Sequence, residues 1–242
     1  NYFVTQDEIT EFKKIVKKII KIDDFNDLNL IDFDLVVNFR IRAEEFQYKA
    51  KRVCLGAKYF PIKPELKNIR KRNMVKEIDD YHNVLVLIGS FDHHNIASRL
   101  IYILDEILQN KKIHLVISEK KSFNLINNTI KCLPMTDAIE NYYSDVDFII
   151  TGGGLSKYEA GYCCIPNASF SQNEGQHEDT KILASEGLTF DLGMANNFDT
   201  EQIKIKLMDS ICLDSRKDIY NSSKKKYITE SAENLAKEIM MI

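Results

Sequence analysis

Three consecutive glycines, Gly152, Gly153 and Gly154, follow an apolar β-branched run and precede a short amphipathic segment in this chain of 242 residues. Glycine has no side chain, so backbone amides in such a turn can approach a bound group closely. Residues 155–162 are predicted to form a helix whose N-terminus points at the turn, which favours an anion such as phosphate. The spacing indicates a phosphate-binding turn. A purely structural turn is the alternative that the triplet alone leaves open.

The residues after the turn form a longer pattern. The chain reads GGGLSKYEAG from Gly152, then Ile165 and Pro166, then QNEGQ over residues 172–176 and ASEG over residues 184–187. This pattern resembles the nucleotide-binding signature of GT-B glycosyltransferases, in particular the MurG-like group and the UDP-sugar hydrolase family of pseudaminic acid biosynthesis. The loop GSFDHHN at residues 89–95 resembles the glycine, aspartate and asparagine loop of that hydrolase family.

The resemblance implies roles for the polar groups near the turn. Ser156 and the amides around it would hold a diphosphate, Glu159 would accept hydrogen bonds from both ribose hydroxyls, and Gln176 would lie beside the sugar or phosphate. The implied nucleotide-binding residues are Gly89, Asn95, Gly152, Gly153, Gly154, Leu155, Ser156, Glu159, Gln172 and Gln176.

Several of these residues also have an ordinary structural interpretation. Glu159 could be an acid that the helix dipole favours near a helix N-terminus. Ser156 could be a plain helix cap. Gln172 competes with Gln176 because the alignment can slip in this loop, and either could be a surface amide. The sequence leaves these alternatives open.

Asp92, His93, His94 and Asn95 follow a predicted strand and open a predicted helix, so their side chains should face the cleft between the lobes. His93 or His94 could transfer a proton or donate to phosphate, and Asp92 is a third catalytic candidate. Helix capping is the alternative for Asp92 and Asn95. Neighbouring histidines point in different directions and no third ligand has a suitable spacing, so neither a metal nor another cofactor is predicted.

Composition excludes several classes of function. The 33 basic and 36 acidic side chains give a net charge of −3, which provides no general attraction to nucleic acid. No apolar run approaches the roughly 20 residues that span a bilayer, and no signal peptide is present, so a soluble protein is expected. The five cysteines are an odd number without C-x-x-C spacing, which favours reduced thiols in the cytoplasm.

The elements that must position these residues alternate between strand and helix. Such alternation predicts a doubly wound, Rossmann-like parallel sheet with helices on both faces and ligands at the carboxyl ends of the strands. The predicted strands are 84–88, 113–118, 130–133, 146–150, 168–171 and 189–192. The predicted helices are 95–109, 122–127, 136–144, 155–162, 179–186, 200–212 and 215–241, the last with a break.

The N-terminal part carries its own signals. Thr5 and Glu8 form a capping-box signature before apolar residues at helical spacing, and residues 18–23 and 34–38 are predicted strands. Residues 43–73 are predicted to be a connection because glycine and proline interrupt them. With the resemblance, this predicts a GT-B-like α/β chain of two domains. Residues 1–75 would be the end of a first, acceptor or catalytic, lobe with the crossover, and residues 76–242 the nucleotide-sugar-binding lobe.

The resembling hydrolase family has a glycine-rich loop with a histidine near its N-terminus, and no Gly-x-Gly-His stands in this chain. We therefore expect a fragment of a longer polypeptide, or a partner chain that completes the first lobe. The resemblance implies an enzyme class, UDP-sugar hydrolase or glycosyltransferase, in which this chain binds the diphosphate of UDP or a UDP-sugar. Hydrolysis is favoured because residues 89–95 and the crossover at residues 55–59 look more like the hydrolase.

Two other classes compete with this interpretation. The chain could be the non-catalytic nucleotide-binding subunit of a split glycosyltransferase, which an exposed apolar face on residues 36–39 and on the N-terminal helix would support. It could also be an NAD-binding Rossmann protein, since Glu119 follows a predicted strand where that fold places an acid. The Gly-x-Gly-x-x-Gly spacing of that class is absent, which argues against it.

Overall fold

The computed structural model describes residues 5–24, 33–89, 92, 94–118 and 121–242. The chain divides into a smaller unit, formed by Asn1–Lys63 and Tyr227–Ile242, and a larger unit, Pro64–Lys226. The sequence placed the boundary after residue 75 instead. The difference arises because long-range packing, rather than chain order, decides where a helix belongs.

Two helices account for the difference in boundary. Helix α2 (Pro64–Asn73) packs against α4 (Glu140–Tyr143) and so lies in the larger unit. The C-terminal helix α9 (Ser231–Met240) packs against the 3₁₀ turn η2 (Ala57–Tyr59) and so lies in the smaller unit.

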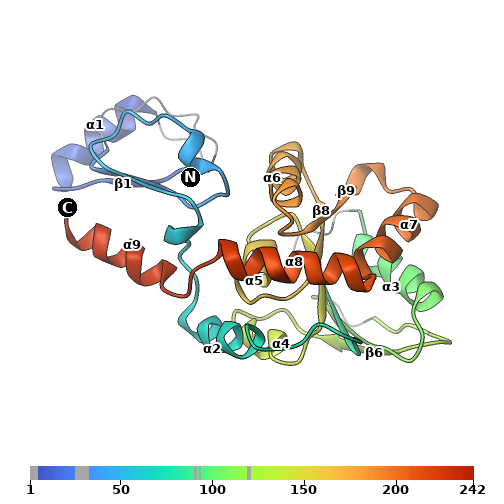
Figure 1. Ribbon diagram of the computed structural model, residues 1–242. Coiled ribbons are helices and arrows are strands. Elements are labelled where there is room, and N and C mark those ends of the chain that lie inside the picture. The colour runs from blue at the N-terminus through green and yellow to red at the C-terminus, as the bar shows by residue number, and fades with distance from the viewer. Residues whose placement is uncertain (1–4, 25–32, 90–91, 93, 119–120) are drawn as a thin grey trace. The chain divides into compact units, whose positions relative to one another are not determined.

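The described residues of the larger unit form a six-stranded parallel sheet with the order β6-β5-β4-β7-β8-β9 (Figure 1). The first strand along the chain lies in the middle and the third and sixth lie at the edges, which is the doubly wound Rossmann order. The predicted fold class is therefore confirmed. The strands are β4 (Asn83–Leu87), β5 (Lys112–Val116), β6 (Thr129–Leu133), β7 (Phe148–Gly152), β8 (Asn167–Ser171) and β9 (Phe190–Met194).

Side chains alternate between the two faces of this sheet. On one face, residues such as Val86, Ile150 and Phe170 form the main apolar core with helices α3 and α7. On the other face, Thr151 and Ser169 are buried on the side of α5 and α6, which contact β7, β8 and β9. The helices are α3 (Ile96–Ile107), α5 (Ser156–Tyr162), α6 (Glu174–Ser185), α7 (Thr200–Ile211) and α8 (Leu213–Lys226).

The centre of the sheet contains a topological switch point. Strands β4 and β7 are neighbours, yet the helices that follow them, α3 and α5, pack on opposite faces. The chain therefore leaves the two strands in opposite directions, and open parallel sheets bind ligands beyond the carboxyl ends of the strands at such a point. Gly89 follows β4 at this edge, and Gly153 follows β7.

The smaller unit holds a three-stranded parallel sheet in the order β1-β2-β3 among its described residues. Thr5 and Glu8 form the predicted capping box at α1. Residues 36–39 do not form the exposed apolar face that would support a non-catalytic subunit, because β2 lies between two strands and these residues are buried. The elements are α1 (Gln6–Ile15), β1 (Ile20–Ile22), β2 (Leu35–Asn38) and β3 (Val53–Leu55).

Two predicted segments differ from the structure. Residues 122–127 form a loop rather than a helix, because the Asp105 carboxylate accepts hydrogen bonds from the amides of Ile126 and Asn127 at 2.8 and 3.0 Å. Residues 43–73 are more regular than a connection, since they contain β3 and α2. Helix α2 begins at Pro64. Proline fits the first turn because the backbone nitrogens there donate no hydrogen bond within the helix.

Candidate functional site

The glycine turn begins where β7 meets β4. A Cβ on Gly152 would lie 2.3 Å from the backbone oxygen of Ile88, so the two strand ends approach too closely for a side chain. Gly89, one residue further along the neighbouring strand, has φ +98°, a conformation that favours glycine. The end of β4, immediately before Gly89, and the start of the glycine turn thus lie together at the switch point.

Gly153 and Gly154 have different surroundings. A Cβ on Gly153 would lie 2.8 Å from Gln176 Oε1 and 3.0 Å from Ser171 Cα, so the turn packs against α6 and the end of β8. Gly154 is exposed, its φ lies outside the left-handed region, and a Cβ there would meet no described atom within 4 Å. Packing therefore explains Gly152 and Gly153, while Gly154 leaves open space at the surface of the turn.

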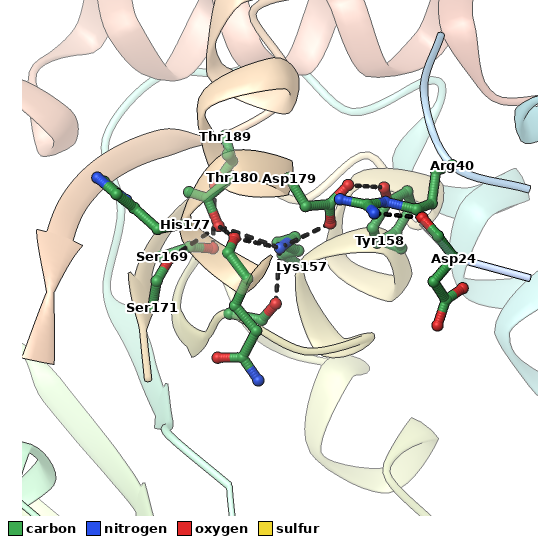
Figure 2. A network of polar contacts seen from close by, with 12 residues as sticks. Asp24, Arg40, Lys157, Tyr158, Ser169, Ser171, His177, Asp179, Thr180 and Thr189 are labelled. Carbon is green, nitrogen blue, oxygen red and sulfur yellow. Dashed lines mark hydrogen bonds and ion pairs between the residues drawn. The ribbon is translucent and has the colours of Figure 1, made fainter. Parts of the chain in front are cut away.

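A buried lysine, which sequence reasoning missed, holds the turn from behind. Lys157 is 0% exposed, and its Nζ lies 2.6 Å from the Gly153 carbonyl oxygen, 2.9 Å from Asp179 Oδ2 and 3.0 Å from Thr180 Oγ1 (Figure 2). One ammonium thus links the glycine turn to α6. Lys157 precedes the buried Ala160 and Gly161 by three and four residues, so helical spacing on a buried face is the signal that could have found it.

Further hydrogen bonds surround this lysine. The Tyr158 hydroxyl donates to Asp179 Oδ1 at 2.7 Å, Thr180 Oγ1 donates to the Gln176 carbonyl at 2.8 Å, and the Ser171 hydroxyl donates to Thr180 at 3.1 Å. Most of these groups are buried, and each has a hydrogen-bond partner, as buried polar groups in stable proteins usually do. Helices α5 and α6 and strand β8 are therefore joined by one polar network directly beneath the turn.

Glu159, the implied ribose ligand, is half-buried on α5 near Tyr143 of α4. Burial raises the pKa of the Tyr143 hydroxyl well above its ordinary value, and the negative charge of Glu159 raises it further. The pKa of the Cys163 thiol is raised by burial first, and Glu159 contributes there too. Cys163 and Cys164 are both buried, in the way that small apolar core residues are.

Gln172 and Gln176 both lie beside the turn but differ in their contacts. Gln176 Oε1 accepts a hydrogen bond from the backbone N–H of Gln172 at 2.8 Å. The backbone N–H of Gln176 donates to Oδ1 of Asn173, the N-cap residue of α6, at 3.0 Å. Gln172 Nε2 is shielded from solvent and has no hydrogen-bond partner in the described part of the chain. Gln176 therefore shapes the loop, and Gln172 has the donor that is still to be satisfied.

Asp92 caps α3. Its two carboxylate oxygens accept from the amides of Ile96 and Ala97 at 2.7 and 2.9 Å, the ordinary role that the sequence allowed. Asn95 adopts a left-handed conformation, makes no side-chain cap bond and accepts from Lys121 Nζ at 3.0 Å. His94 is exposed, and His93, like Glu119, lies outside the described residues.

Asp92→Ala should lower the free energy of unfolding by about 1–2 kcal/mol, because two amides at the start of α3 lose their acceptor. Urea denaturation followed by circular dichroism measures this change. His94→Ala, at an exposed neighbouring position, should change stability by less than about 0.5 kcal/mol. An Asp92 variant as stable as the His94 variant would contradict the capping role.

His177, adjacent to Gln176 in sequence, faces away from the Lys157 network (Figure 2). Its Nδ1 lies 3.8 Å from Asp191 Oδ1, too far for a hydrogen bond, and it lines a separate hollow between α6, β9 and α7. Within residues the structure describes, no three His, Cys, Asp or Glu side chains are grouped to hold a metal ion. None of the helices in this described part is long and apolar enough to cross a membrane.

Solved structures with the same fold include glycosyltransferases. MurG of Acinetobacter baumannii superposes with a TM-score of 0.71 at 13% identity, covering 99% of this chain and 71% of MurG. The spinosyn rhamnosyltransferase SpnG complexed with thymidine diphosphate gives a TM-score of 0.57 at 10% identity, covering 96% of this chain and 77% of SpnG. Parallel sheets flanked by helices thus give this chain the Rossmann-like fold of GT-B glycosyltransferases, as expected.

Sequence comparison finds relatives at higher identity than these structures. The chain is 24% identical over 189 residues to the spore coat polysaccharide biosynthesis protein SpsG of Bacillus subtilis, covering 73% of this chain and 55% of SpsG. It is 26% identical over 195 residues to an uncharacterized protein of Methanocaldococcus jannaschii, covering 72% of this chain and 40% of that protein. The chain therefore spans about half the length of these curated relatives. No protein-family model matches it.

Proposed function

We propose that this chain binds the diphosphate of a UDP-sugar at the carboxyl ends of β4 and β7. The observation that carries the proposal is the exposed Gly154. A Cβ there would meet no described atom within 4 Å, and its φ lies outside the left-handed region, so neither packing nor backbone conformation requires a glycine. A glycine without a reason in the protein's own packing suits the close approach of a ligand to the backbone. The turn also lies at the switch point, where open parallel sheets bind ligands.

Neighbouring side chains support a nucleotide over a bare anion. Glu159 offers a half-buried carboxylate one helical turn beyond Ser156, suited to the two ribose hydroxyls. Gln172 contributes an amide nitrogen that has no partner among the described residues, near the implied sugar or phosphate position. The thymidine diphosphate complex of SpnG, which shares the fold, is consistent with a nucleoside diphosphate ligand.

The proposed chemistry is attack on the anomeric centre of the UDP-sugar, either by water or by an acceptor sugar. Backbone amides of the glycine turn would stabilise the charge that develops on the leaving diphosphate, a contribution that preset donors make without reorganisation. Hydrolysis remains the favoured variant on the sequence of the loop at residues 89–95. Catalytic proton transfer is not assigned to a described residue.

Isothermal titration of UDP into the wild type and Glu159→Ala tests the proposal. We expect measurable binding by the wild type, and a loss of about 1–3 kcal/mol in the variant, because a carboxylate that accepts hydroxyl hydrogen bonds is removed. Glu174→Ala is the matched control, since Glu174 is an exposed glutamate in the first turn of α6. It should bind UDP like the wild type. Absence of UDP binding by folded wild-type protein would refute the proposal.

A second candidate is a nucleotide-binding subunit that acts with a partner chain or with further polypeptide of the first lobe. In the smaller unit, Ile20 and Ile22 of β1 and Phe12 and Ile15 of α1 expose apolar side chains. β1 is an edge strand among the described residues, so it could pair with an added strand. Light scattering at several concentrations tests this: a mass that rises with concentration supports association through such a surface.

A further inference from the structure

The carbonyl oxygen of Gly153 is held by a buried cation. Lys157 Nζ donates to it at 2.6 Å, and the same ammonium is anchored to α6 by Asp179 at 2.9 Å and by Thr180 at 3.0 Å. Because the lysine is fully buried, the carbonyl must point into the protein. The direction of this one peptide is therefore set by contacts with another element, rather than by the turn itself.

Peptide geometry then fixes the next amide. A trans peptide is planar, with its carbonyl and N–H pointing in opposite directions, and the described residues contain no cis peptide bond. Since the Gly153 oxygen points inward, the Gly154 N–H points outward. Gly154 is exposed, and its N–H has no hydrogen-bond partner among the described residues. The turn thus presents an open donor at the place where a side chain is also missing.

We infer that Lys157 is a positioning residue, which orients the peptide between Gly153 and Gly154 so that the Gly154 amide meets a diphosphate oxygen. This inference rests on the proposed nucleotide binding. Glycines on both sides of the peptide offer little steric resistance to its rotation, so the lysine hydrogen bond is what opposes it.

Loss of the lysine hydrogen bond would turn the peptide. The Gly153 carbonyl would then be buried without a donor, an unfavourable state that rotation toward water relieves. Rotation also turns the Gly154 N–H inward, away from the ligand. UDP would bind only the fraction of molecules with the amide outward, and the affinity would fall in proportion to that fraction.

Two variants separate positioning from the buried ion pair. Asp179→Asn and the double variant Lys157→Met/Asp179→Asn both remove the carboxylate charge, but only the double variant removes the donor to Gly153. We expect isothermal titration to show UDP affinity near the wild-type value for Asp179→Asn. The double variant should bind about tenfold more weakly, as for a competent population of about one tenth. Equal affinities in the two variants, whether lowered or not, would overturn the inference.

The Gly154 amide gives a readout that needs no ligand. In ¹⁵N-labelled wild type and Asp179→Asn, we expect a single Gly154 amide resonance, and its hydrogen should exchange rapidly with solvent. In the folded double variant this resonance should shift or split. An unchanged resonance there, or a protected Gly154 amide in the wild type, would overturn the positioning role even if the double variant did not fold. A wild type that shows the expected amide behaviour but binds no UDP would refute the proposed function alone.

Discussion

Replacing Lys157 with methionine should lower the free energy of unfolding of the larger unit by about 3–5 kcal/mol, the usual cost of breaking a buried ion pair from one side. Methionine matches the length of the lysine stem, so the loss comes from the ammonium rather than from a cavity. The ammonium serves Asp179, Thr180 and the Gly153 carbonyl together, and all three lose a donor at once.

Urea denaturation followed by circular dichroism measures the effect of Lys157→Met. Lys217→Met is the matched control, because Lys217 is an exposed lysine on a helix of the same unit. Its stability should stay within about 0.5 kcal/mol of the wild type. If Lys157→Met were as stable as this control, Lys157 could not be the buried link between α5 and α6 that the structure describes.

Gly152→Ala should be the most disruptive alanine substitution in the glycine turn, with a loss of about 3 kcal/mol in the free energy of unfolding. Its methyl group would stand 2.3 Å from the Ile88 backbone oxygen, and neither partner is a flexible side chain that could move aside. Strands β4 and β7 would have to separate at their ends, and overpacking of this kind commonly costs 1–3 kcal/mol or more.

Gly154→Ala, two residues away, makes the same chemical change in open space. It should alter stability by less than about 0.5 kcal/mol, since a Cβ there meets no described atom within 4 Å. If the proposed diphosphate site is correct, the methyl group should instead lower UDP affinity by about tenfold. Thermal denaturation and UDP titration of both variants separate the two effects. A Gly154 variant less stable than the Gly152 variant would contradict the assignment of the two glycines.

The sequence by itself determined the local and periodic features of this protein. Alternating apolar runs and helical spacings predicted the parallel sheet, and Thr5 and Glu8 predicted the capping box of α1, because these signals depend on neighbours within a few residues. The GGGLSKYEAG pattern likewise predicted a glycine turn between a strand and a helix, and the structure has that turn between β7 and α5.

Only the tertiary structure decided which residues share a contact across the chain. Lys157 is buried and paired because Asp179 and Thr180, more than twenty residues away in the sequence, lie against it. Residues 122–127 form a loop because the carboxylate of Asp105, on helix α3, accepts hydrogen bonds from two of their backbone amides. Burial and pairing in both cases depend on elements that are distant in sequence, and a local pattern carries no record of which distant element will pack against it.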